Sequence, residues 1–159
     1  MLKLTKRTEY GLIAVLHLAD REGEVVPARE IAERYPLPQR LLAEVLKDLG
    51  RSGIVESQRG AAGGYWLARS SDAITLGQIV EALEGAPALT SCQDLGASSS
   101  DGECEVQPVC PIRSPLTRLR QGIWAMLEGT TLRSLANNSF TPVELISAAA
   151  TPRGKEPAA

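Results

Sequence analysis

The chain has 159 residues, of which 43% are apolar and only 4% aromatic, so aliphatic side chains must fill the core of one domain or of a small domain with an appendage. No apolar run approaches the ~20 residues of a membrane span, and the N-terminal stretch lacks the pattern of a signal peptide, so we expect a cytoplasmic protein. The net charge of −2 is uneven, because residues 1–71 carry 11 Lys and Arg against 9 Asp and Glu, whereas residues 72–159 carry 6 against 10.

Three helices are predicted in the first third of the chain. The first, over residues 6–20, is apolar nearly all round and is expected to be buried on most sides. Pro27 suits the first position of a second helix, over 27–34, and Pro36 stops that helix. The third, over about 38–51, has a single apolar stripe. This stripe consists of Leu41, Leu42, Val45, Leu46 and Leu49.

The opposite face of the third helix carries side chains that can form hydrogen bonds to DNA. Two helices joined by a short break form a helix-turn-helix, whose second helix places its N-terminal turn in a major groove. The candidate DNA-binding residues of this face are Pro38, Gln39, Arg40, Ala43, Glu44 and Lys47. The alternative for these two helices alone is an ordinary helical hairpin with a solvated face.

Two short strands, over 54–57 and 65–68, are predicted after the third helix, with the glycine-rich segment 58–64 between them. A hairpin directly after a helix-turn-helix is a wing. Arg59 and Gly60 lie where the wing would approach DNA, because glycines let the backbone come close and an arginine can enter a narrow, electronegative minor groove. The alternative is a plain surface hairpin with a solvent-exposed arginine.

All three cysteines, Cys92, Cys104 and Cys110, fall within one stretch of 19 residues that has no helical or strand period. The stretch follows a helix predicted over 76–84 from the capping-box pattern of Thr75 and Gln78. A loop this long inside a compact chain is usually functional or disordered. Thiolates concentrated in a loop suggest a bound zinc ion or an iron–sulfur cluster, and their odd number argues against a disulfide framework.

A longer helix, reaching about residue 128, is predicted from Ser114 and Pro115 as N-cap and first residue. It has a heptad-like apolar seam, formed by Leu116, Leu119, Ile123 and Met126. Such a helix either packs on its own domain or pairs with its copy, and a two-fold pairing suits a protein that reads two half-sites. A short helix over 132–136 and a poorly ordered tail are expected after it.

Several motifs occur together in this chain: Leu4-Thr-Lys-Arg-Thr-Glu-Tyr10, Ile31-Ala-Glu, Gly53-Ile-Val55, Arg59-Gly60 with Gly63-Gly64-Tyr65, and three cysteines before a long helix. In these motifs the chain resembles the Rrf2 family of bacterial winged-helix regulators, over residues 2–136. The resemblance implies a fold that is mainly α with a small β wing. It divides the chain into a winged helix-turn-helix domain at 1–86, a cysteine cluster-binding loop at 87–111, a dimerisation helix with a short terminal helix at 112–137, and a disordered tail at 138–159.

The resemblance also implies a homodimer that binds a palindromic operator in double-stranded DNA. By similarity, the third helix reads bases and Arg59 enters the minor groove. An iron–sulfur cluster, 4Fe-4S or 2Fe-2S, would be held by Cys92, Cys104 and Cys110. The gap from Cys92 to Cys104 is longer than is usual in the family.

The fourth cluster ligand also departs from one family pattern. Arg113 stands where some members have a histidine, and His17, the single histidine of the chain, is expected to be a packed or capping side chain of the first helix. In other members an acidic residue near the N-terminus of the partner subunit completes the cluster. Glu9 matches that position; alternatively, Glu9 is a carboxylate favoured by the helix dipole.

Three functions compete at this point. The leading hypothesis is a transcription regulator whose operator binding is controlled by an iron–sulfur cluster that senses redox state, nitric oxide or iron. The second keeps DNA binding but replaces the cluster with zinc or with thiols that act directly as redox switches. The third is an enzyme or a protein-binding module, and the lack of any nucleophile–base pairing or phosphate loop in the sequence argues against catalysis.

Overall fold

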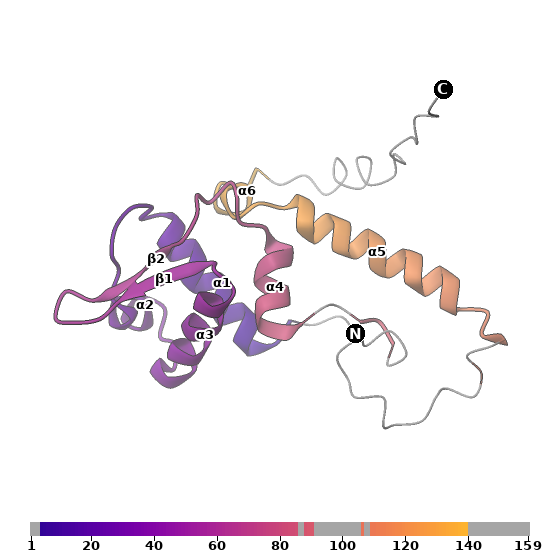
Figure 1. The fold of residues 1–159 in the computed structure, drawn as a ribbon, viewed down its shortest axis with the longest axis horizontal. Coiled ribbons are helices and arrows are strands. Elements are labelled where there is room, and N and C mark those ends of the chain that lie inside the picture. The colour runs from indigo at the N-terminus through magenta and orange to yellow at the C-terminus, as the bar shows by residue number, and fades with distance from the viewer. Residues whose placement is uncertain (1–3, 86–87, 91–105, 107–108, 140–159) are drawn as a thin grey trace.

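The computed structural model describes residues 4–85, 88–90, 106 and 109–139. In chain order the elements are α1 (Lys6–Ala19), α2 (Ala28–Arg34), α3 (Gln39–Arg51), β1 (Val55–Gln58), β2 (Gly64–Leu67), α4 (Leu76–Glu84), α5 (Arg113–Gly129) and α6 (Leu132–Ala136). Figure 1 shows α1 to α4 gathered around one core, with the β1–β2 hairpin at one end and α5 extending from the other. The predicted fold class, mainly α with a small β wing, is confirmed.

The core is built from aliphatic side chains of the first four helices. The fully buried members include Leu18 of α1, Ile31 of α2, Leu46 and Leu49 of α3, and Ile79 of α4. The helix α1 contacts α3, α4 and α6, so it lies at the centre of this unit. Burial of α1 on several sides agrees with its nearly all-round apolar sequence.

The β1–β2 hairpin is antiparallel, with Val55 opposite Leu67 and Gln58 opposite Gly64. Both strands lie within one residue of the predicted ranges. Val26 pairs with β2 in a short β-bridge, because its N–H donates to the Tyr65 carbonyl at 2.9 Å and its carbonyl accepts from the Tyr65 N–H at 2.8 Å. Only glycine fits at position 64, since a Cβ there would lie 2.5 Å from the Val26 carbonyl oxygen.

The helix α4 begins with the predicted capping box. The Thr75 hydroxyl accepts from the Gln78 N–H at 3.2 Å, and the Gln78 side chain accepts from the Thr75 N–H at 3.4 Å. Gly85 follows the last helical residue as the C-cap.

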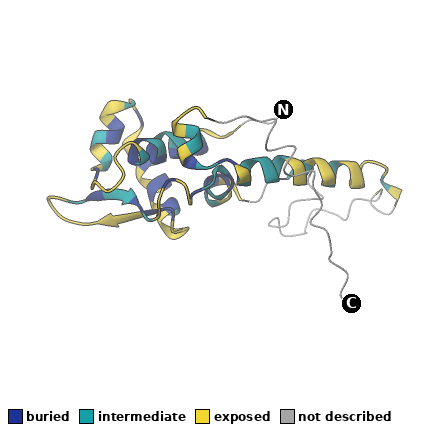
Figure 2. Cartoon of the chain, turned by 90° about the horizontal axis from the view of Figure 1, so that it is seen from above, coloured by how far each residue is buried: buried dark blue, intermediate teal, exposed yellow. Residues whose placement is uncertain are grey.

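The long helix α5 starts earlier than predicted, at Arg113, with Ile112 at the N-cap and no side-chain cap bond. Ser114 and Pro115 therefore lie inside the first turn, where proline is tolerated because its missing N–H would have no helical partner. No residue of α5 is buried, and Figure 2 shows the helix in exposed and intermediate colours along its length. The exposed apolar side chains Ile112 and Leu119 are 56% and 53% accessible.

The predicted short helix is confirmed as α6, which follows α5 directly. Most of the cysteine loop, including Cys92 and Cys104, and most of the predicted tail lie outside the described residues. Within the described part of the chain, no helix is both long and apolar enough to cross a membrane.

Candidate nucleic-acid interface

The helices α2 and α3 are joined by a tight turn. The Leu37 N–H donates to the Ala32 carbonyl at 3.1 Å, and the Leu37 side chain is buried beneath the turn. Pro38 occupies the N-cap of α3 rather than its first turn, without a side-chain cap bond. This geometry directs the N-terminal turn of α3 to the surface.

The two faces of α3 separate as the predicted stripe requires. Leu42, Val45, Leu46 and Leu49 are buried, which leaves the opposite side in solvent. The candidate DNA-binding residues of α3 are all exposed: Pro38, Gln39, Arg40, Ala43, Glu44 and Lys47. Arg40 and Glu44 form an exposed ion pair at 3.4 Å one turn apart, and such a pair contributes little to stability, so DNA can displace it at small cost.

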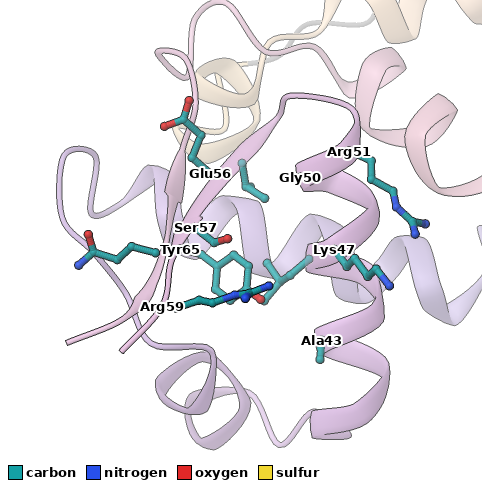
Figure 3. A pocket seen from close by; sticks show the side chains of 11 residues that line it. Ala43, Lys47, Gly50, Arg51, Glu56, Ser57, Arg59 and Tyr65 are labelled. Carbon is teal, nitrogen blue, oxygen red and sulfur yellow. The ribbon is translucent and has the colours of Figure 1, made fainter. Parts of the chain in front are cut away.

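A groove of about 660 Å³ separates α3 from the wing. Ala43, Lys47 and Arg51 line it from α3, while Arg59 and Tyr65 line it from the hairpin. In Figure 3 the Arg59 side chain extends from the wing past the Tyr65 ring toward α3. The Glu56 carboxylate points away from Arg59 and from α3. The groove thus joins the predicted recognition helix and the predicted wing into one surface.

The charge on this surface is positive. Lys47 and Arg59 have no carboxylate within ion-pair distance among the described residues. Arg51 is partly neutralised, because its guanidinium contacts the Asp48 carboxylate at 3.0 Å, and Asp48 also pairs with Arg7 of α1. Cationic side chains over a groove are the electrostatic pattern of a phosphate-binding surface.

The wing tip keeps its shape through glycine. Gly60 has a φ of +116°, a conformation that residues with a Cβ rarely adopt. A Cβ on Gly63 would lie 2.6 Å from the Gln58 carbonyl oxygen. The Gln58 side chain closes the tip by donating to the Ala62 carbonyl at 3.0 Å. The backbone next to Arg59 is therefore compact and almost bare of side chains.

Of the predicted DNA-binding residues, Ala43, Lys47 and Arg59 line the groove, and the other lining residues were not predicted: Leu46, Gly50, Arg51, Val55, Glu56, Ser57, Gln58 and Tyr65. Arg51 lies four residues after Lys47 and so continues the same helix face, a signal that the sequence does contain. Tyr65 lies on the strand predicted over 65–68, but no sequence pattern indicates that its side chain faces α3.

Of the three predicted cysteine ligands of the cluster, the described residues include only Cys110. Cys110 is half-buried and lies just before α5, whereas Cys92 and Cys104 lie outside the described residues. Among the described residues, no group of three His, Cys, Asp or Glu could hold a metal ion. The Cys110 thiol has the donor chemistry of an iron–sulfur ligand, and the cluster stays a prediction because the other two cysteines lie outside the described residues.

Glu9 lies in the first turn of α1, where both readings of the sequence place it. Its carboxylate accepts from the Lys6 ammonium at 2.5 Å, and this hydrogen bond raises the pKa of Lys6. The Glu9 side chain is 36% exposed, so it is accessible to a neighbouring subunit. The choice between helix-end carboxylate and cluster ligand stays open.

The N-terminus of α1 is tied to the end of α4, close to where the cysteine loop begins. The Glu84 carboxylate accepts from the Thr5 N–H at 2.9 Å and from the Thr8 hydroxyl at 2.5 Å. Burial pushes the pKa of Glu84 upward, but the hydrogen bonds from Thr8 and Thr5 outweigh this effect and hold it below its usual value.

The prediction for His17 is confirmed. It is 7% exposed, and its ring contacts the Tyr35 hydroxyl and the Glu30 carboxylate, each at 3.3 Å. His17 therefore packs α1 against α2.

Comparison with known proteins identifies the family of the chain. The profile of the Rrf2 family, described as iron-dependent transcriptional regulators, matches residues 4–138. The HTH-type transcriptional regulator NsrR of Bacillus subtilis is 32% identical over 146 residues, covering 91% of this chain and 97% of that protein. Among solved structures, CymR, the global cysteine regulator of B. subtilis, has a TM-score of 0.67 at 32% identity and covers 87% of this chain and 98% of that one. IscR of T. potens has a TM-score of 0.64 at 27% identity and covers 96% and 94%.

Proposed function

Because the chain belongs to the Rrf2 family of DNA-binding transcription regulators, which are not enzymes, we propose that it binds a palindromic operator as a homodimer under the control of an iron–sulfur cluster. The observation that carries the DNA part is the cationic groove between α3 and the wing. The protein works in the cytoplasm, where its DNA lies.

The two sides of the groove have different roles in this proposal. The exposed N-terminal turn of α3, with Gln39 and Arg40, enters a major groove and contacts base edges. The Arg59 side chain extends from the wing into the adjacent minor groove of the DNA. Lys47 contacts phosphates of the strand that passes between them, a contact that adds affinity without sequence preference.

A second copy of the chain covers α5. This helix has 17 residues and none of them is buried, although it carries an apolar seam. Pairing of two α5 helices removes Leu119 and Ile112 from water and sets the distance between two recognition helices. A palindromic site requires this two-fold arrangement.

The cluster ligands are Cys92, Cys104 and Cys110, with Glu9 of the partner subunit as the fourth. The family's description as iron-dependent regulators and the three cysteines between α4 and α5 in the sequence support this assignment. When bound, the cluster supplies an iron centre that is sensitive to redox state and to nitric oxide. In this proposal the ligands tie the cysteine loop of one chain to the first helix of the partner subunit, so that the loop constrains how the dimer presents its two α3 helices.

Anaerobic purification tests the cofactor. We expect a brown protein with visible absorption that bleaches on exposure to nitric oxide or oxygen, together with stoichiometric iron. A colourless protein with one zinc ion per chain would contradict the cluster and support a structural zinc site instead.

Operator binding tests the control mechanism. A duplex is first selected from a random pool with the wild-type protein. The Cys104→Ala variant should then bind this duplex with an affinity that no longer responds to nitric oxide, while Ser99→Ala, a matched change in the same loop, should respond like wild type. An unchanged response in Cys104→Ala would contradict the mechanism.

A further inference from the structure

A polar cluster joins three distant parts of the chain: the loop between α1 and α2, the segment after the wing, and α6. The Glu22 carboxylate accepts from the Ser71 N–H at 3.2 Å and from the Ser71 hydroxyl at 3.1 Å. Arg133 of α6 donates to Glu22 at 3.3 Å and, through Nε, to Asp72 at 2.6 Å. The single guanidinium of Arg133 therefore contacts Asp72, which lies 61 positions earlier in the sequence, and Glu22, which lies 111 positions earlier.

Backbone hydrogen bonds fix the same junction next to α5. The Leu76 N–H donates to the Thr130 carbonyl at 2.8 Å, and the Leu132 N–H donates to the Ile74 carbonyl at 2.8 Å. The Leu132 and Ile74 side chains are 1% and 0% exposed. The C-terminal end of α5 thus cannot change direction without moving α6 and Arg133.

The loop that holds Glu22 also supports both DNA-reading elements. Four residues after Glu22, Val26 exchanges two backbone hydrogen bonds with Tyr65 of β2. Pro27 then forms the N-cap of α2, the first helix of the helix-turn-helix.

We propose that Arg133 is a positioning residue, which sets the orientation of the winged helix-turn-helix relative to α5 and so the spacing of the two recognition helices. The inference rests on the proposed function as a dimer on a palindrome. The side chains of Arg133, Glu22 and Asp72 are 48%, 36% and 60% exposed, so their ion pairs contribute little to folding stability. The planar fork of the arginine contacts two carboxylates at fixed angles, and this geometry suits it to control orientation.

The test uses two duplexes and the full-length protein. One is the palindrome selected from a random pool with the wild-type protein, and the other is the same duplex with one half-site scrambled. An altered orientation weakens only the duplex that needs both half-sites in register. A general folding or charge effect weakens both duplexes by the same factor.

We expect Arg133→Gln to bind the palindrome at least tenfold more weakly than wild type, and to bind the single half-site within twofold of wild type. Arg133→Lys, which keeps the charge but loses the fork, should show the same selective loss at a smaller size and serves if the Gln variant folds poorly. Arg21→Gln is the control. It removes an ion pair at 3.0 Å, to Glu30, in the same loop but without a link to α6, so it should leave the ratio of the two affinities unchanged.

A double variant sharpens the test. Glu22→Gln keeps an oxygen that can accept from the Ser71 N–H, so the change mainly removes the contact with Arg133. Adding it to Arg133→Gln should therefore cause no further selective loss. Equal losses on the two duplexes, or wild-type affinity of both Arg133 variants for the palindrome, would overturn the inference. Failure of the wild-type protein to select any duplex would instead overturn the proposed function.

Discussion

The glycine at position 64 offers a sharp test of the close approach between the wing and the α1–α2 loop. A Cβ placed there would lie 2.5 Å from the Val26 carbonyl oxygen, 2.7 Å from its carbon and 3.0 Å from the Pro27 nitrogen. All three atoms are backbone, so no side chain can turn away to make room. The Gly64→Ala variant must therefore move either β2 or the loop.

The size of the effect follows from what that movement breaks. If the loop withdraws, the two Val26–Tyr65 hydrogen bonds are lost, each with a net value of about 1 kcal/mol. If it stays, the extra methyl overpacks a buried site at a cost of about 1–3 kcal/mol. Either route lowers the free energy of unfolding by about 2 kcal/mol.

Urea denaturation at one fixed protein concentration measures this loss, because a dimer's apparent stability depends on concentration. Gly50→Ala in α3 is the control. The nearest atom to its Cβ is the Val55 carbonyl oxygen at 3.8 Å, an ordinary contact, so the helix preference for alanine should stabilise it by up to about 1 kcal/mol. A Gly64→Ala protein within about 0.5 kcal/mol of wild type would refute the reasoning.

Three further predictions concern charge, the α5 face and pH. Replacing Lys47 or Arg59 with Ala should lower the slope of log K against log salt by about 1 each, measured by fluorescence anisotropy on the selected operator; an unchanged slope would remove that residue from the phosphate contacts. Gly122→Ala should stabilise the protein against urea by up to about 1 kcal/mol, because nothing lies within 4 Å of the added Cβ; a loss of dimer mass in light scattering would show instead that the partner helix packs on this glycine. Because the folded pKa of Glu84 lies below the ordinary 4.5, its contribution to stability is complete above that value and is lost as pH falls through the folded pKa. The Glu84→Gln variant should therefore lose less stability than wild type between pH 5 and 3 by circular dichroism, and an equal loss would contradict this role.

The elements with a local periodic signal could be predicted from the sequence. The stripe of α3 repeats with the helical period. Four of its five members are buried, and the fifth, Leu41, is half-buried: Leu42, Val45, Leu46 and Leu49 are the buried ones. The capping box of α4 depends on two residues three positions apart, and it forms as the pattern predicts. In both cases the energetic cause lies within one or two turns of helix.

Features that depend on distant contacts could not be predicted in this way. The predicted start of α5 is wrong because Ser114 and Pro115 fit an N-cap as well as a first turn. The actual N-cap, Ile112, has no side chain that could form a capping hydrogen bond. The Glu22–Arg133 contact joins positions 111 residues apart. The groove exists only because β2 places Tyr65 opposite α3.

The exposure of α5 means that the activity of the regulator should depend on how many copies of it a cell contains. The helix is about 25 Å long, buries none of its residues and packs within its own chain mainly on α4, and isolated helices of this length are only marginally stable in water. In the proposed homodimer, the order of α5 is linked by mass action to the encounter with a second copy. A low intracellular level of the protein should leave α5 frayed and the DNA unbound, so the number of molecules per cell becomes an input alongside the chemical signal.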